Sequence, residues 1–257
     1  MLDLPQHVLD DELLFTAADL LQRRSGKNRT LQLAPPHTII IGQQRTVIDA
    51  VLKRYRRTKI DGFFGDAWLL KMHGQPIGVV KPVGPGAPII AAVLEELIAF
   101  GVKQVVSIGL AGGLQSDLHC GDVVIADRAL RDEGTSYHYL PPARSVEADP
   151  ALVQQLSAAL SARGVAHSSG ASWTTDAPYR ETRREIETYR AEGIKTVEME
   201  AAAMFAVSQR LKIATAAVLV IGDRLADLVW RPPVDTRLLE QRLKTVAEII
   251  AAALSEG

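Results

Sequence analysis

Short apolar runs that end in glycine or a polar residue recur along this chain, and they limit its possible folds more than any other feature. Residues 38–42 read Thr-Ile-Ile-Ile-Gly, and residues 104–109 and 214–221 are similar runs rich in valine and isoleucine. Continuous apolar runs of this length are typical of strands that are buried on both faces, as in a parallel sheet covered by helices. The sequence therefore favours an α/β fold.

Segments with apolar residues at helical spacing alternate with the predicted strands. We expect helices at residues 46–55, 89–100, 151–163, 183–191, 200–209 and 235–254, further strands at 122–129 and 165–174, and a hairpin at 63–80 that turns at His73-Gly74. This order predicts a single α/β domain with a mixed, largely parallel central sheet flanked by helices on both faces. No linker, charge run or repeat divides the chain. We assign residues 37–257 to this domain, and residues 1–36, with a helix at 10–23, to a lead-in that belongs to the same unit.

Composition excludes several classes of partner. The 29 basic and 30 acidic residues give a formal net charge of −1, so no surplus of positive charge is present to bind a nucleic acid backbone. No uncharged apolar run reaches the roughly 20 residues that span a bilayer. A single cysteine, Cys120, and an acidic N-terminal segment predict a cytoplasmic protein. The six histidines are scattered, and no metal site is expected.

Two glutamates, Glu198 and Glu200, flank Met199 directly before an alanine-rich predicted helix. A carboxylate at a helix N-terminus is stabilised by free N–H groups and can accept hydrogen bonds from two neighbouring hydroxyls, such as those of a ribose. The alternative is that both glutamates simply cap the helix. Ligands of such sheets bind at the carboxyl ends of strands. Glycines and aspartates follow several predicted strands there: Gly42, Gly84, residues 109–113, Asp176 and Gly222-Asp223.

Five blocks of the sequence, in order, resemble one family. They are GPGAPIIAAVLEELIAFGVKQVVSIGLAGGL (residues 84–114), CGDVVIADRALRDEGTSYHYLPP (120–142), TTDAPYRE (174–181), VEMEAAAMFAV (197–207) and VIGDRLAD (220–227). From about residue 38 onward the chain is similar to the nucleoside phosphorylase superfamily, which includes uridine phosphorylases, purine nucleoside phosphorylases and methylthioadenosine nucleosidases.

The resemblance implies a pentosyltransferase of nucleoside metabolism and salvage. Such an enzyme cleaves the N-glycosidic bond of a purine or pyrimidine (deoxy)ribonucleoside and releases the free base and ribose 1-phosphate. It implies no cofactor, with inorganic phosphate as co-substrate, and a dimer or a hexamer built from dimers.

The resemblance also assigns residues. Glu200 would bind the ribose 2′ and 3′ hydroxyls, Met199 would pack under the sugar, and Glu198 would lie beside it. Asp223 would protonate the leaving base. His7 would reach the 5′ hydroxyl of a neighbouring subunit's substrate.

For the base, the resemblance points to four residues, namely Arg184, Arg224, Tyr179 and Gly112. The two arginines match positions that bind pyrimidine carbonyls, whereas Asp223 matches a residue of purine-cleaving members. The identity of the base therefore stays open.

The expected phosphate site departs most from the family. Gly42, Arg45, Ser107 and Leu110 fall near its positions, but Thr46, Phe63 and Ser107 stand where relatives carry arginines. Lys81 is a possible substitute cation. Two reactions remain open, phosphorolysis and hydrolysis by water, together with a catalytically silent nucleoside-binding protein. A dinucleotide site at Gly84-x-Gly86 is disfavoured because the third glycine of that motif is absent.

Overall fold

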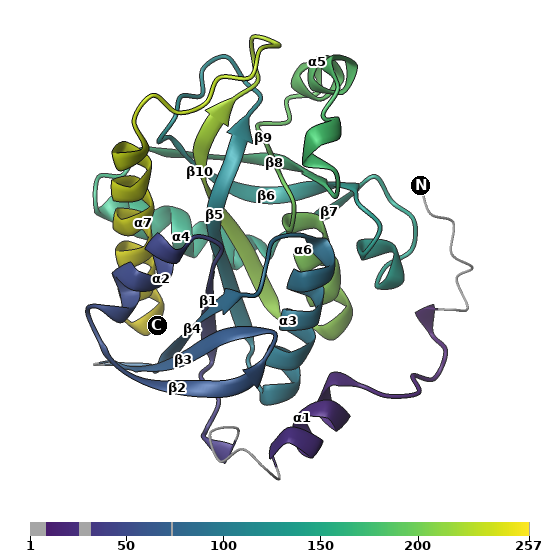
Figure 1. Cartoon of the computed structure of the whole chain (residues 1–257), viewed down its shortest axis with the longest axis vertical. Helices are drawn as coiled ribbons and strands as arrows, with labels where there is room; N and C mark the ends of the chain where they lie inside the picture. The colour runs from purple at the N-terminus through teal and green to yellow at the C-terminus, as the bar shows by residue number, and fades with distance from the viewer. Residues whose placement is uncertain (1–8, 26–31, 73, 257) are drawn as a thin grey trace.

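The computed structural model describes residues 9–25, 32–72 and 74–256, and ten strands within these residues form one mixed sheet with helices on both faces (Figure 1). The strands are β1 (Thr38–Gly42), β2 (Arg56–Phe63), β3 (Gly65–Lys71), β4 (Ile77–Pro82), β5 (Gln104–Gly113), β6 (Val123–Asp132), β7 (Ser145–Glu147), β8 (His167–Thr175), β9 (Thr196–Glu198) and β10 (Ala214–Arg224). The α-helices are α1 (Ala17–Ser25), α2 (Arg45–Leu52), α3 (Ala87–Phe100), α4 (Pro150–Ala162), α5 (Arg183–Ala191), α6 (Ala201–Leu211) and α7 (Thr236–Glu256). Two 3₁₀ turns, η3 (Ser136–His138) and η4 (Pro178–Arg180), complete the described elements.

The centre of the sheet is parallel, because β4, β1, β5 and β10 pair in that order with the same direction. Successive residues of β1 alternate between two cores. Ile39 and Ile41 pack in the cluster formed with α3 and α6, whereas Ile40 packs in the cluster formed with α2, α4 and α7. Burial on both faces explains why the apolar runs of these strands are continuous. The predicted α/β class, with helices on both faces of a mixed sheet, is confirmed.

Five strands pair in a closed ring. β5 pairs with β10, β10 with β6, β6 with β8, β8 with β9, and β9 returns to β5. In Figure 1, β6 and β8 run across the upper parts of β5 and β10. The ring brings the end of β9 beside the ends of β5 and β10, although these strands are far apart in the sequence. It therefore gathers side chains from three separate segments at one edge.

Most of the predicted elements are present, and the differences have local causes. The predicted hairpin is confirmed as the antiparallel pair β3 and β4, with His73 of its turn outside the described residues. The strand β2 was not predicted, because it is a largely exposed edge strand that carries several charged residues and lacks an apolar run. The strands β7 and β9 were not predicted either, because three residues are too few to show the alternation of apolar and polar side chains that indicates a strand.

The lead-in helix begins later than its apolar spacing predicts. Thr16 and Asp19 hydrogen bond reciprocally, with the Thr16 main-chain N–H donating to Asp19 Oδ2 at 2.8 Å, and this cap starts α1 at Ala17. The helix packs against α3. Arg24 donates to the buried carboxylate of Glu96 at 2.7 Å, which ties the lead-in to the sheet domain.

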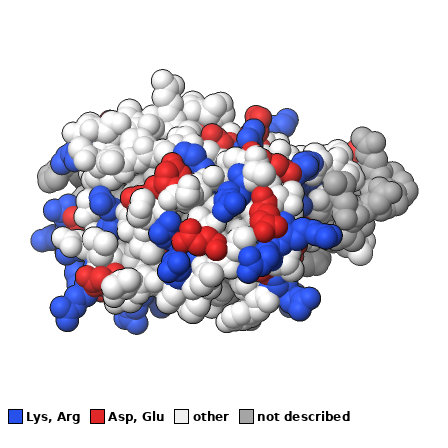
Figure 2. Space-filling model, turned by 90° about the horizontal axis from the view of Figure 1, so that it is seen from above, with Lys and Arg blue, Asp and Glu red and all other residues white. Residues whose placement is uncertain are grey.

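Acidic and basic side chains are interspersed on the face shown in Figure 2, in keeping with the near-neutral charge of the chain. Among residues 9–25, 32–72 and 74–256, no helix has the length and apolar character that a bilayer crossing requires.

Candidate active site

Glu198 ends β9 and caps α6. Its Oε2 accepts hydrogen bonds from the main-chain N–H groups of Glu200 at 2.8 Å and Ala201 at 2.7 Å, and its Oε1 accepts from Thr174 Oγ1 at 2.6 Å. Thr174 Oγ1 in turn accepts from the N–H of Ala202 at 2.9 Å. The residue is only 7% exposed, and burial raises the pKa of its carboxyl while these hydrogen bonds oppose the rise. The capping interpretation thus describes Glu198, and its contact with a sugar stays a prediction.

Glu200 is the residue immediately before α6, and its carboxylate is held from a distant segment. The Gly86 N–H, at the start of α3, donates to Glu200 Oε1 at 2.5 Å. Gly86 has a φ of 106°, a conformation that residues other than glycine rarely adopt. Burial and the neighbouring Glu198 carboxylate raise the pKa of Glu200 to about 7. Glu200 therefore changes its charge near neutral pH.

A cavity of about 180 Å³ lies against Glu200, between the start of α6 and the ends of β1 and β5. It brings together five of the predicted site residues, namely Glu198, Met199, Glu200, Ser107 and Leu110. The rest of its lining is Gln43, Gln44, Pro85, Gly109, Ala201, Met204, Ala217 and Leu219. The sugar and phosphate positions that the sequence predicted are therefore adjacent in space.

Two predicted phosphate ligands do not line this cavity. A Cβ on Gly42 would lie 2.7 Å from Ile48 Cδ1, so this glycine is needed for the close packing of α2 on β1. The Arg45 side chain is 83% exposed and pairs with Asp49 one turn along α2, at 3.5 Å. Gln43 and Gln44 line the cavity in their place. Lys81, on β4, is also absent from its lining.

Asp223 lies near the end of β10, beside Gly112 of β5, with which it pairs in the sheet. A Cβ on Gly112 would lie 3.2 Å from Asp223 Oδ1, so glycine leaves room for the carboxylate. The indole N–H of Trp230 donates to Asp223 Oδ2 at 2.6 Å and orients this group. Burial and the charges of Asp223 and Glu185 raise the pKa of Glu181 to about 7. Glu181 is thus a second carboxyl near Asp223.

Three residues predicted to bind the base do not line the cavity beside Glu200. Tyr179 is 99% exposed on η4, and Arg184 is exposed in the first turn of α5. Arg224 directs its guanidinium to the Ser116 carbonyl at 3.3 Å, since successive residues of a strand point to opposite faces. The family resemblance assigned all three to the base, and their contact with a base stays a prediction.

His7 lies outside the described residues. No group of three or more histidine, cysteine, aspartate or glutamate side chains suited to a metal ion occurs in the part of the chain that the structure describes.

The sequence interpretation missed four site residues. Gln43 and Gln44 follow the glycine that ends β1, a position where ligands often bind, and this signal was available. Gly86 and Trp230 offered none, because Gly86 meets Glu200 across 114 positions of the chain and Trp230 lies in an irregular loop.

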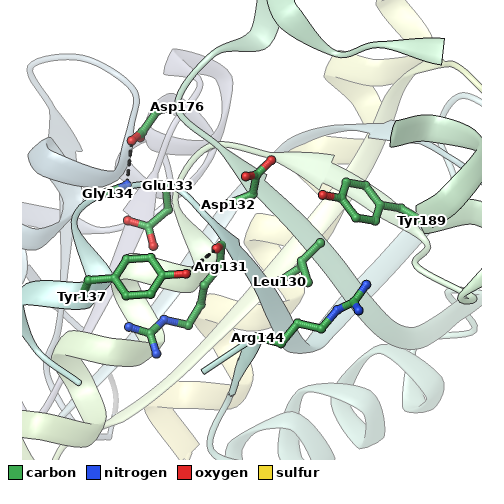
Figure 3. A pocket seen from close by; sticks show the side chains of 9 residues that line it. All are labelled: Leu130, Arg131, Asp132, Glu133, Gly134, Tyr137, Arg144, Asp176 and Tyr189. Atoms are coloured by element: carbon green, nitrogen blue, oxygen red, sulfur yellow. Dashed lines mark hydrogen bonds between the residues drawn. The ribbon is translucent and has the colours of Figure 1, made fainter. Parts of the chain in front are cut away.

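A larger cavity, of about 600 Å³, lies elsewhere, between the end of β6 and α5 (Figure 3). Tyr137 stacks over the Arg131 guanidinium at 4.3 Å, and Asp176 accepts a hydrogen bond from the Gly134 N–H at 2.9 Å. Asp176, which follows a predicted strand, lines this larger cavity, whereas Glu198, Met199 and Glu200 line the smaller one.

Comparison with known proteins identifies the family of this chain. The model of the phosphorylase superfamily matches residues 43–256, a span that includes Glu200, Asp223 and the whole cavity. The chain belongs to the phosphorylase superfamily. This membership confirms the resemblance to nucleoside phosphorylases and the prediction that the chain is an enzyme.

Its relatives within the superfamily differ in the nucleoside that their names give. Uridine phosphorylase of Haemophilus influenzae is 28% identical over 203 residues, which are 73% of this chain and 79% of that protein. A DeoD-type purine nucleoside phosphorylase of Latilactobacillus sakei is 30% identical over 213 residues, 79% of this chain and 84% of the relative. Guanosine phosphorylase of Halorubrum lacusprofundi is 30% identical over 142 residues, 55% and 59% of the two chains.

Proposed function

We propose that this chain cleaves the N-glycosidic bond of a purine or pyrimidine nucleoside. The observation that supports this proposal is the Glu200 carboxylate, which is fixed by the Gly86 N–H at 2.5 Å and lines a cavity together with Met199. An ionised carboxylate so placed accepts hydrogen bonds from both the 2′ and 3′ hydroxyls of a ribose. Met199 offers an apolar surface to the sugar ring.

Each carboxylate has a separate task in the reaction. As the bond between C1′ and the base nitrogen breaks, its electron pair leaves with the base and positive charge develops on the sugar. The negative charge of Glu200 stabilises that sugar cation. Asp223, oriented by Trp230, donates a proton to the departing base or a hydrogen bond to one of its nitrogens.

Two acceptors are compatible with this arrangement. Phosphorolysis, which gives ribose 1-phosphate, is the reaction that the family resemblance implies. Hydrolysis is the second candidate, and one specific observation favours it. Among the described residues that line the cavity there is no lysine, arginine or histidine.

The experiment that tests the proposed function measures release of free base from inosine, adenosine, methylthioadenosine and uridine, with and without phosphate. Glu200→Ala should lower kcat/KM by about a hundredfold or more, the usual cost of removing a group that stabilises transition-state charge. Glu187→Ala, which removes an exposed carboxylate on α5, is the matched control. Tight binding of nucleosides without release of base would show a silent binding protein instead.

We also propose that the protein self-associates as a dimer or hexamer and uses no cofactor. Sedimentation velocity of the purified chain measures its oligomeric state. Activity that persists after exhaustive dialysis would support the absence of a cofactor.

A further inference from the structure

Two glutamines that follow β1 extend into the cavity beside Glu200. The Gln43 main-chain N–H donates to the Ile108 carbonyl at 3.1 Å, which anchors this residue against β5. A Cβ on Gly109 would lie 3.2 Å from Gln43 Cγ and 3.8 Å from Gln44 Oε1. Gly109 therefore leaves the space that both glutamine side chains occupy.

One atom in each glutamine amide lacks a hydrogen-bond partner among the residues that the structure describes. Gln43 Nε2 and Gln44 Oε1 are both buried, and neither makes a hydrogen bond within residues 9–25, 32–72 and 74–256. Buried polar atoms nearly always have a hydrogen-bond partner, because a buried atom without one has lost its hydrogen bond to water and gained none in return. Each amide carries a donor N–H₂ and an acceptor oxygen, and the two unpaired atoms are one donor, Gln43 Nε2, and one acceptor, Gln44 Oε1. The cavity thus offers hydrogen bonds to a ligand from two uncharged groups.

The charge of the same cavity is unfavourable for an anion. Its lining contains the Glu198 and Glu200 carboxylates, and no cationic side chain from the described residues balances them. The first turn of α2 supplies only the half charge of a helix dipole, and the N-terminus of α6 is already capped by Glu198. When these carboxyls are ionised they repel a phosphate dianion, whereas a neutral ligand is not repelled.

We infer that Gln43 and Gln44 form the acceptor subsite and hold a water molecule for attack on the sugar, an inference that rests on the proposed function. One amide donates an N–H to the water oxygen, and the other accepts one of its hydrogens. The remaining lone pair of the oxygen is then directed at C1′. Gln43 and Gln44 act by positioning the nucleophile and carry no charge into the reaction.

The reaction balances without a further reactant. The water oxygen bonds to C1′ and the bond from C1′ to the base breaks, with the electron pair leaving on the base. The water loses one proton to solvent, and the base gains one proton through Asp223. The products are free ribose and free base.

The acceptor is tested with the wild-type enzyme in phosphate-free buffer and with added phosphate. We expect base release at the same rate in both, free ribose as the sugar product, and no ribose 1-phosphate by ³¹P NMR. Release that requires phosphate and yields ribose 1-phosphate would overturn the inference but leave the proposed function standing. No release from any nucleoside, under either condition, would overturn the proposed function and the inference with it.

Substitutions test the two glutamines directly. Gln43→Ala and Gln44→Ala should each lower kcat about tenfold or more, as expected for a misplaced nucleophile, with little change in the KM for nucleoside. Gln44→Asn should retain part of the activity, and Gln154→Ala, on the exposed face of α4, is the matched control. Circular dichroism and Tm establish that each variant is folded. An unchanged kcat in both folded alanine variants would contradict the role of the amides.

A gain-of-function variant gives an independent outcome. Gln44→Arg places a cation in the cavity and should make base release faster when phosphate is added, with ribose 1-phosphate among the products. Gln154→Arg adds the same charge outside the cavity and should show no response to phosphate.

Discussion

Glu200 affects the stability of this protein as well as its proposed function, because burial and the nearby Glu198 carboxylate raise its pKa from the usual 4.5 to about 7. Between these two values the folded chain binds more protons at this group than the unfolded chain does. The contribution of Glu200 to the free energy of unfolding therefore falls as the pH rises from about 4.5 to about 7. The ionised form of Glu200, which ribose binding would need, thus lowers the stability of the folded chain.

The variant Glu200→Gln tests this linkage. The amide can still accept the Gly86 N–H, but it carries no charge, so the variant should be more stable than wild type at pH 8 by on the order of 2 kcal/mol. The difference should shrink as the pH falls and disappear below about 4.5. Urea unfolding across this pH range measures it, with Glu187→Gln as the exposed control. A stability difference that does not vary with pH would contradict the raised pKa.

At the scale of elements, the start of α6 is the part that positions Glu200. Thr174 of β8 donates to Glu198 and accepts from the Ala202 N–H, so one hydroxyl joins the sheet, the capping carboxylate and the helix. Behind it the first eight residues of α6 are buried, with small alanines that allow the helix to lie close to its neighbours. The cap and the packing together fix where the helix begins.

Thr174→Val keeps the shape of this buried side chain but removes its hydroxyl. The variant leaves the Ala202 N–H and part of the Glu198 carboxylate unpaired, and it should lose about 2–3 kcal/mol of unfolding free energy. It should also raise the KM for nucleoside, because Glu200 is no longer held at the same place. The control is Thr188→Val, an exposed position on α5 where a change within about 0.5 kcal/mol is expected. Equal stability of both variants would show that the hydroxyl does not fix α6.

At the scale of the whole molecule, the lead-in helix is joined to the sheet domain through a buried carboxylate. Glu96 of α3 is 2% exposed, and it accepts from Arg24 of α1 at 2.7 Å and from the Phe64 N–H at 2.7 Å. Arg24 also donates to the Gly62 carbonyl. We propose on this basis that residues 1–36 and the domain form one cooperative unit.

Arg24→Ala tests that unit. It leaves the buried Glu96 carboxylate without its cation, and we expect the global free energy of unfolding to fall by about 2–3 kcal/mol, less than for a fully buried pair because Arg24 is partly exposed. Arg23→Ala removes an exposed arginine of the same helix and should change little. If both variants unfold at the same urea concentration as wild type, the lead-in folds separately from the domain.

Local patterns in the sequence predicted much of this protein. The apolar runs identified the central strands, helical spacing identified most helices, and the segment before α6 indicated a capping carboxylate. These features could be predicted because the spacing of buried apolar residues within one helix or strand is visible in a few neighbouring residues. Exposed β2 and the short β7 and β9 lack such a period and were missed.

The sequence by itself determined the α/β class, the family and the position of Glu200 at the start of a helix. Only the tertiary structure decided which side chains share the cavity. It placed Gln43 and Gln44 there, turned Arg45 to solvent, and brought Gly86 and Trp230 to the two carboxylates. The physical reason is that closure of the strand ring sets the distances between residues far apart in the chain. Those distances cannot be predicted from the pattern of neighbouring residues.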